Sequence, residues 1–226
     1  MSLKSRLILR LVLVLPLLAA LICAPAGSFR FWQGWMYVGI FGLFTAILVA
    51  YFYRRDPDLL ERRMRTREPR HEQKRVKMLW VPLWICALGL PAFDYRFRWS
   101  SALLGGVPIW LSAISWFFVA GGWWVVFEVM RWNSFASATV QVESGQKVVT
   151  GGPYRVVRHP MYAGFSLLIL GTPFALGSYV ALVPALLLIP VLIIRLRDEE
   201  RVLRQELPGY AEYCEHTRSR LIPWVF

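Results

Sequence analysis

Apolar runs long enough to cross a lipid bilayer restrict the fold of this chain more than any other feature. A helix needs about 20 apolar residues to cross the hydrocarbon layer, and several runs in the 226-residue sequence approach or exceed that length. Hydrophobic residues make up 57% of the chain, above the roughly 45–50% of soluble domains. We therefore predict an all-α, polytopic integral membrane protein with five to six transmembrane helices.

Six helical segments account for the apolar runs. We predict them at residues 7–25, 31–53, 78–93, 102–130, 161–176 and 179–195. Gly171, Pro173 and the pair Gly177-Ser178 interrupt the last apolar region in its middle. These residues favour a tight hairpin of two helices, and a single kinked span is the alternative. Residues 196–207 then continue as a charged helix that leaves the membrane.

The basic residues lie beside the apolar runs. The formal net charge is +12, which in a soluble protein would suggest nucleic acid. Here Lys and Arg gather at 54–77, after residue 130 and in the C-terminal tail, as expected of cytoplasmic loops. We therefore predict no nucleic-acid partner and contact with anionic membrane lipids. The N-terminus, the functional site and the C-terminus are predicted to be cytoplasmic.

Residues 54–77 form a basic loop with ten Lys or Arg and five Asp or Glu. Within it, residues 58–65 are typical of a short helix lying on the membrane surface. The loop either only orients the chain or also covers part of a substrate entrance. Residues 1–26 fit a secretory signal peptide as well, but the length of the apolar run favours a retained first span.

Cysteine and histidine indicate neither a disulfide framework nor a metal site. There are three of each, without a pairing pattern or the spacing of metal ligands. They are Cys23, Cys86, Cys214, His71, His159 and His216. We therefore predict no bound metal.

One polar stretch, residues 146–162, stands between two very apolar regions. Its Gly151-Gly152-Pro153 segment predicts a tight turn with available backbone amides. Pro160 suits the first turn of the following helix, whose N-terminus offers free N–H groups and a partial positive charge to an anion. His159 could hydrogen-bond a ligand from this rigid position, and a purely structural histidine is the alternative.

A second polar block follows the apolar hairpin. Arg195, Glu199 and Leu203 lie at i, i+4 and i+8 along one helical face. Arg195 comes directly after the apolar run, where ionisable residues are costly and commonly functional. Its guanidinium could hold a carboxylate through two parallel hydrogen bonds, and Glu199 could accept a hydroxyl or amine or offset a cation. A surface ion pair is the alternative for this block, and Glu128 and Arg131 are also spaced for an intrahelical pair.

Together the two blocks favour a polar ligand that carries both anionic and cationic groups and arrives from water. Its reaction partner should be lipophilic, because the site opens at a bilayer. S-adenosylmethionine fits, with a carboxylate, an amine, an adenosine and a sulfonium. No GxGxxG segment follows a predicted strand, so the soluble dinucleotide-type route to such a cofactor is missing. The residues thus indicate a membrane enzyme with a nucleotide-like cofactor.

Three motifs, taken in order, carry a resemblance to a known family. They are Gly-Pro-Tyr-Arg-Val-Val-Arg-His-Pro-Met-Tyr at 152–162, Glu-Glu-x-x-Leu at 199–203 and Tyr-x-x-Tyr at 210–213. With the hairpin between them, this order resembles the isoprenylcysteine carboxyl methyltransferase family. That family is related to phospholipid N-methyltransferases and, more distantly, to membrane sterol reductases. The resemblance covers about residues 130–223 and departs at Leu207-Pro-Gly-Tyr210, which lies one residue closer to Leu203 than the family's usual Phe-Gly.

The resemblance implies roles for individual residues. Cofactor binding would fall on Gln141, Gln146, Lys147, Val148, Val149, Tyr154, His159, Pro160, Met161, Tyr162 and Glu199. Arg195 would approach the substrate carboxylate, and Arg195 and Glu199 are the implied catalytic residues. The implied domains are N-terminal transmembrane helices over 1–130 and a methyltransferase-like region over 131–226, made of the cofactor loop, the hairpin and a C-terminal helix.

The predicted function is S-adenosylmethionine-dependent methyl transfer to a lipophilic acceptor, either a small molecule or a prenylated one. The nearest activity is isoprenylcysteine carboxyl O-methylation. A carboxylate is already a nucleophile at neutral pH, so catalysis would consist mainly of positioning in a site shielded from water. The alternatives are a phospholipid or thiol methyltransferase, a nicotinamide-dependent membrane reductase and a non-catalytic membrane assembly factor.

Overall fold

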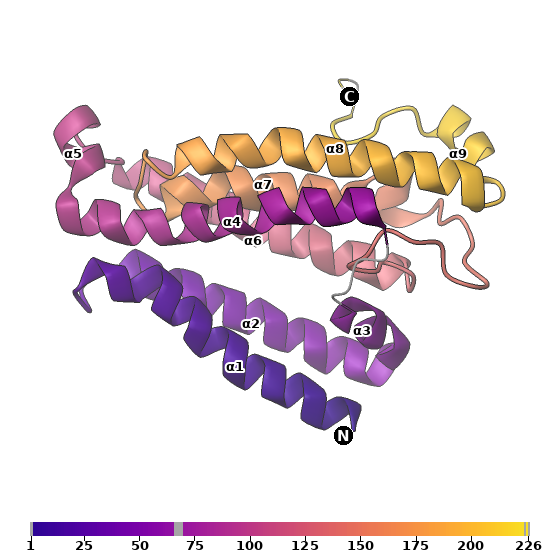
Figure 1. The fold of residues 1–226 in the computed structure, drawn as a ribbon, viewed down its shortest axis with the longest axis horizontal. Helices are drawn as coiled ribbons and strands as arrows, with labels where there is room; N and C mark the ends of the chain where they lie inside the picture. The colour runs from indigo at the N-terminus through magenta and orange to yellow at the C-terminus, as the bar shows by residue number, and fades with distance from the viewer. Residues whose placement is uncertain (1, 66–69, 224, 226) are drawn as a thin grey trace.

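Every regular element in the described part of the chain is helical (Figure 1). The computed structural model describes residues 2–65, 70–223 and 225. Its α-helices are α1 (Leu3–Cys23), α2 (Trp32–Arg55), α3 (Pro57–Met64), α4 (His71–Phe97), α5 (Trp99–Leu104), α6 (Ile109–Trp132), α7 (Pro160–Ala175), α8 (Leu182–Glu206) and α9 (Tyr210–His216). Two short 3₁₀ helices are η1 (Ala24–Ala26) and η2 (Gly152–Arg155). The predicted all-α class is confirmed.

Four of the described helices are long and apolar enough to cross a membrane: α1 with η1, α2, α4 and α6. Large apolar side chains such as Leu17, Leu43 and Phe117 are exposed on these helices, and extended apolar surface of this kind is typical of a membrane contact. The polytopic membrane fold is confirmed, with four qualifying helices where five to six were predicted. The difference lies in the last pair, because α7 has only 16 residues and α8 becomes polar from Arg195 onward.

The apolar region at 161–195 folds as a hairpin of α7 and α8, as predicted, and not as one kinked span. Gly177 follows α7 with a φ of +74°, a left-handed conformation that glycine adopts at little cost. Ser178 in the turn donates a hydrogen bond of 2.5 Å to Oδ2 of Asp94. This bond ties the turn of the hairpin to the C-terminal end of α4.

Helix α4 is longer at both ends than the helix predicted at 78–93. Pro82 and Pro91 lie inside it, as membrane helices tolerate when neighbouring groups satisfy the freed backbone. The polar first turn of α4 carries Gln73, whose side chain is fully buried in the bundle. Part of the predicted basic loop is therefore the start of a helix that buries one face, with Gln73 and Val76, against the bundle.

The short helix predicted at 58–65 is present as α3, and its placement on the membrane surface stays a prediction. The side chain of Asp56 caps it by accepting a hydrogen bond of 3.0 Å from the backbone N–H of Leu59. Leu59 and Leu60 are buried in a cluster with residues of α1, α2 and α6. Residues 66–69 of the predicted basic loop lie outside the described residues.

The helix predicted at 102–130 is also displaced, because α6 begins at Ile109. Gly105 and Gly106 adopt positive φ angles and separate α6 from the short α5. The Glu128–Arg131 pair near the end of α6 is confirmed, with 2.7 Å between the charged atoms.

The bundle has two distinct ends. In Figure 1, α3, α9 and the loop that follows α6 lie at one end, and α5 and the α7–α8 turn lie at the other. The two polar blocks found in the sequence therefore share one end of the bundle. The side of the membrane that this end faces stays a prediction.

Candidate active site

A cavity of about 530 Å³ brings the two polar blocks together. All twelve residues predicted for the site line it. They are Gln141, Gln146, Lys147, Val148, Val149, Tyr154, His159, Pro160, Met161, Tyr162, Arg195 and Glu199. The tertiary structure thus places the predicted residues around one space, and their individual roles stay predictions.

The turn at 151–153 closes over the indole ring of Trp132. A Cβ atom on Gly152 would lie 2.4 Å from that ring, and the φ of Gly152 is +56°. Both the close approach and the left-handed backbone require glycine here. The predicted tight turn is present, and it fixes where the chain enters the cavity wall.

Tyr154 follows this turn and is held at both ends. Its hydroxyl accepts a hydrogen bond of 2.8 Å from Nδ2 of Asn133, and its carbonyl accepts one of 2.7 Å from the hydroxyl of Tyr213. Burial raises the pKa of Tyr154 above its ordinary value, so the phenol is neutral at physiological pH. Asn133 was not predicted, because nothing in its spacing marks it as a partner of Tyr154.

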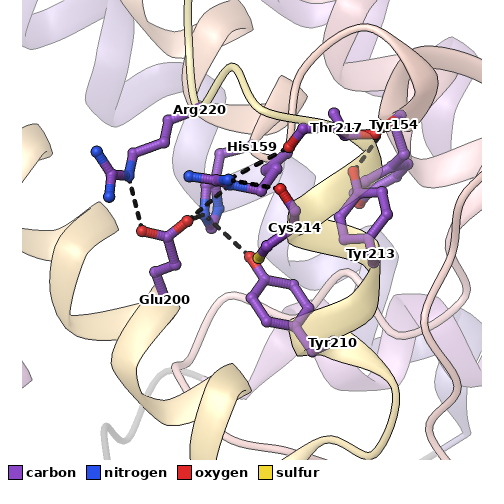
Figure 2. Close-up of polar contacts among 9 residues, drawn as sticks. Tyr154, His159, Glu200, Tyr210, Tyr213, Cys214, Thr217 and Arg220 are labelled. Atoms are coloured by element: carbon purple, nitrogen blue, oxygen red, sulfur yellow. Dashed lines mark hydrogen bonds and ion pairs between the residues drawn. The ribbon is translucent and has the colours of Figure 1, made fainter.

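His159 is the N-cap residue of α7, and Pro160 follows in the first turn as predicted. The imidazole is buried, and its Nε2 lies 3.4 Å from the hydroxyl of Tyr210 (Figure 2). Burial lowers the pKa of His159 below its ordinary value. The ring is therefore neutral at pH 7 and offers one donor and one acceptor.

Glu200 joins two arginines, the buried Arg158 and the partly exposed Arg220, in a cluster next to the cavity. Its carboxylate lies 2.7 Å from Nε of Arg158 and 2.8 Å from Nε of Arg220, and Figure 2 shows its bond to Arg220. Burial alone would raise the pKa of Glu200, but the hydrogen bond from Arg220 and the charge of Arg158 outweigh it and lower that pKa. The backbone N–H of His159 also donates to the carbonyl of Arg220 at 2.9 Å. This cluster fastens the C-terminal tail beside His159.

Glu199, the residue before, lines the cavity instead. Successive residues of an α-helix point about 100° apart, so the two adjacent glutamates reach different surroundings. The hydroxyl of Tyr162 donates a short hydrogen bond to Oε2 of Glu199. Among the described lining residues, Glu199 is the one carboxylate, which makes it the counter-charge for any cationic group bound there.

Arg195 is positioned by two parts of the chain that are distant in sequence. Its Nη1 donates to Oε1 of Gln73 at 2.9 Å, and its Nη2 donates to the carbonyl of Ala138 at 2.9 Å. Gln73 in turn donates from Nε2 to Asp198. The guanidinium is thus oriented by α4 and by the loop after α6 as well as by its own helix.

Gln73 was missed because the sequence around it was interpreted as a solvated basic loop. The available signal is helical periodicity: Gln73, Val76 and Trp80 lie at i, i+3 and i+7, while Lys74 and Arg75 between them are exposed. Arg195 at the cavity is therefore held in part by the half of the chain that the sequence resemblance does not cover.

A second wall of the cavity is apolar and rich in aromatic rings. It is formed by side chains of α1, α2, α4, α6 and α7. They are Leu18, Tyr37, Phe41, Trp80, Val81, Trp84, Leu88, Trp123, Phe165 and Leu168. One cavity thus combines a polar wall at the loop end with an apolar wall inside the helical bundle.

A comparison with known proteins finds a similarity in the second half of the chain. Residues 110–208 match a family model described as phospholipid methyltransferase, which is less than half of the chain. No curated protein matches the sequence. The described residues contain no group of three or more His, Cys, Asp or Glu side chains that could hold a metal ion. The family match supports a membrane methyltransferase and does not favour the nicotinamide-dependent reductase.

Proposed function

We propose that this protein transfers a methyl group from S-adenosylmethionine to the carboxylate of a lipophilic acceptor, as in isoprenylcysteine carboxyl O-methylation. The observation that carries the proposal is the two-sided cavity. Glu199 and a set of tyrosines form its polar wall, Trp80, Trp84 and Trp123 belong to its apolar wall, and Arg195 lines the same space. A polar methyl donor and a lipophilic acceptor can meet in such a space.

The side chains of the polar wall fit the chemistry of the methyl donor. A carboxylate and aromatic faces stabilise a cationic group, and Glu199, Tyr154 and Tyr162 supply them. Lys147 and the amides of Gln141 and Gln146 offer donors and acceptors for the remaining polar groups. We therefore assign this wall to S-adenosylmethionine.

The residues of the chain would act mainly by positioning. When bound, S-adenosylmethionine supplies a sulfonium methyl group, and its transfer to a carboxylate oxygen breaks the carbon–sulfur bond, leaves the electron pair on sulfur and requires no proton removal. Arg195, fixed by Gln73 and Ala138, would hold the acceptor carboxylate in line. The apolar wall would exclude water from the reacting groups.

The family match favours one second candidate, methyl transfer to the amine of a phospholipid. A protonated amine must lose a proton before it can accept a methyl group. Among the described lining residues, the one carboxylate is Glu199, and it already accepts a hydrogen bond from Tyr162. A carboxylate acceptor needs no base, and for this reason we place O-methylation first.

A labelling experiment tests the proposal. The purified protein in nanodiscs would be incubated with methyl-labelled S-adenosylmethionine and either N-acetyl-S-farnesylcysteine, phosphatidylethanolamine or a lipophilic thiol. We expect label in a methyl ester that releases methanol in base. Label in the phospholipid amine would replace the proposal with the second candidate. Binding of NADPH without binding of S-adenosylmethionine, measured by calorimetry, would refute methyl transfer altogether.

Gln73 provides a test of positioning within this function. Gln73→Ala should lower kcat/KM for methyl transfer about tenfold to 100-fold, because a hydrogen bond to a charged group contributes about 1.5–3 kcal/mol. Affinity for S-adenosylmethionine should change little, since Gln73 does not line the cavity. The exposed neighbour Lys74, changed to Ala, serves as the matched control. An unaltered kcat/KM in a folded Gln73→Ala protein would show that Arg195 is held without it.

A further inference from the structure

Helix α3 places a second guanidinium, that of Arg63, at the cavity. Arg63 lines the same space as Arg195, although the sequence places it in the basic loop. The helix beneath it is well anchored: Leu59 and Leu60 are buried, and Arg62 donates a hydrogen bond of 2.7 Å to the carbonyl of Ser134. The position of Arg63 is therefore set by packing of α3 on the bundle.

Arg63 differs from nearby arginines in what it contacts. Arg65 pairs with Glu143 at 2.8 Å and Arg158 pairs with Glu200 at 2.7 Å. Arg63 has no carboxylate partner among the described residues, and its hydrogen bond of 3.2 Å goes to the carbonyl of Ser137. A half-buried guanidinium that faces a cavity without a counter-charge is costly unless an anion binds there.

The charges of the side chains that line the cavity also favour an anionic ligand. Six Lys or Arg side chains line it, against the single carboxylate of Glu199 among the described lining residues, although Arg65 and Arg158 pair with Glu143 and Glu200 outside the lining. Burial, together with the positive charge of Arg195, lowers the pKa of Arg63 below its ordinary value, although Tyr154 and Tyr162 act in the opposite direction. Arg63 and Arg195 thus line one space and are close enough for the charge of Arg195 to act on Arg63.

The order of residues along α8 indicates which ligand this pair would meet. Leu192 is buried in the apolar core, Arg195 follows it, and Glu199 lies one turn further out, about 6 Å along the helix. Arg195 therefore lies between the apolar part of the helix and the residue assigned to the methyl donor. An amphiphile with its tail in the apolar wall would place its head group at this level.

We propose that Arg63 and Arg195 together bind the oxyanionic head group of the acceptor, and that Arg63 is a specificity-determining residue that selects an anionic acceptor over a neutral one. This inference rests on the proposed function for the identity of the acceptor. It adds a residue of the N-terminal half to the substrate site. In addition, it makes α3 the element that sets acceptor preference.

A binding experiment tests the role of Arg63 in acceptor preference without requiring turnover. Binding of N-acetyl-S-farnesylcysteine and of its neutral carboxamide would be measured by quenching of tryptophan fluorescence in the wild type, Arg63→Met and Arg63→Lys. We expect the wild type to prefer the carboxylate about tenfold or more, Arg63→Met to lose most of that preference and Arg63→Lys to keep part of it. The dissociation constant for S-adenosylmethionine should stay within about twofold in all three proteins.

Arg62→Met is the matched control, because Arg62 lies on the same helix and bonds to the same loop but does not line the cavity. It should keep the wild-type preference, which separates head-group binding from loosening of α3. Equal binding of carboxylate and carboxamide by the wild type, or an undiminished preference in Arg63→Met, would overturn the proposal. Weaker binding of S-adenosylmethionine alone in Arg63→Met would instead assign Arg63 to the methyl donor and also overturn it. Failure of methyl transfer with an intact carboxylate preference would reject the proposed function and leave the Arg63 site standing.

Discussion

Arg195→Ala is expected to lower kcat/KM for methyl transfer about 100-fold or more, because loss of one partner of a hydrogen-bonded charge pair costs about 2–5 kcal/mol. The loss should fall on both KM for the acceptor and kcat, since the guanidinium would hold the acceptor carboxylate in the ground state and align it in the transition state. Initial rates with labelled S-adenosylmethionine over a range of acceptor concentrations measure the two parameters separately. Arg195→Lys should recover only part of the activity, because an ammonium group cannot make two parallel hydrogen bonds.

Arg197 offers a matched control on the same helix. It is exposed and does not line the cavity, so Arg197→Ala should retain wild-type kinetics. Arg195 also hydrogen-bonds to Gln73 and Ala138, so the thermal stability of each variant must be measured alongside. A stable Arg195→Ala protein with wild-type turnover would contradict the role assigned to this residue, and a full biological effect without any turnover would favour the assembly-factor alternative.

Glu199→Gln is expected to weaken binding of S-adenosylmethionine about 30-fold or more, because it removes the counter-charge for the sulfonium or the amine. The substitution keeps the size of the side chain and can still accept from Tyr162. The thermal unfolding temperature should therefore change little. Calorimetric titration with S-adenosylmethionine and with S-adenosylhomocysteine, which keeps the charged amine but has a neutral thioether in place of the sulfonium, measures the effect. A larger loss for S-adenosylmethionine would identify the sulfonium as the group that Glu199 compensates, and an equal loss would identify the amine.

Substitution of the adjacent Glu200 is expected to affect stability and not ligand binding. Glu200→Gln removes the negative charge that pairs with buried Arg158 and with the partly exposed Arg220, and removal of one partner from a buried ion pair costs up to about 3–5 kcal/mol of folding free energy. We therefore expect a clearly lowered unfolding temperature in Glu200→Gln and an unaltered one in Glu199→Gln. If both variants lost stability equally and bound S-adenosylmethionine equally, the division between a ligand-binding Glu199 and a structural Glu200 would be wrong.

Local sequence signals predicted the elements that build the polar wall. Pro160 begins α7, the break near Gly177 produces the α7–α8 hairpin, and Arg195 and Glu199 share one face of α8. Each of these features depends on residues within a few turns of one another. Helix periodicity and backbone preference are sufficient for such cases.

The boundaries of α4 and α6 could not be predicted in the same way. Polar residues at 71–77 look like a solvated loop in sequence, yet Gln73 and Val76 are buried. Their burial depends on contacts of α4 with α8, which are more than a hundred residues away along the chain. A local sequence pattern does not show whether a helix that is distant in sequence packs against these residues.

Hydropathy and helical spacing are local properties, so the sequence alone predicted apolar helices with two polar blocks at one end. Which side chains meet at that end depended on the tertiary structure. It brought Gln73 to Arg195 and Arg63 to the cavity, and it directed Glu199 to the cavity and Glu200 to Arg158. These contacts depend on long-range packing. Such packing fixes the surroundings of a side chain but produces no periodic pattern in the sequence.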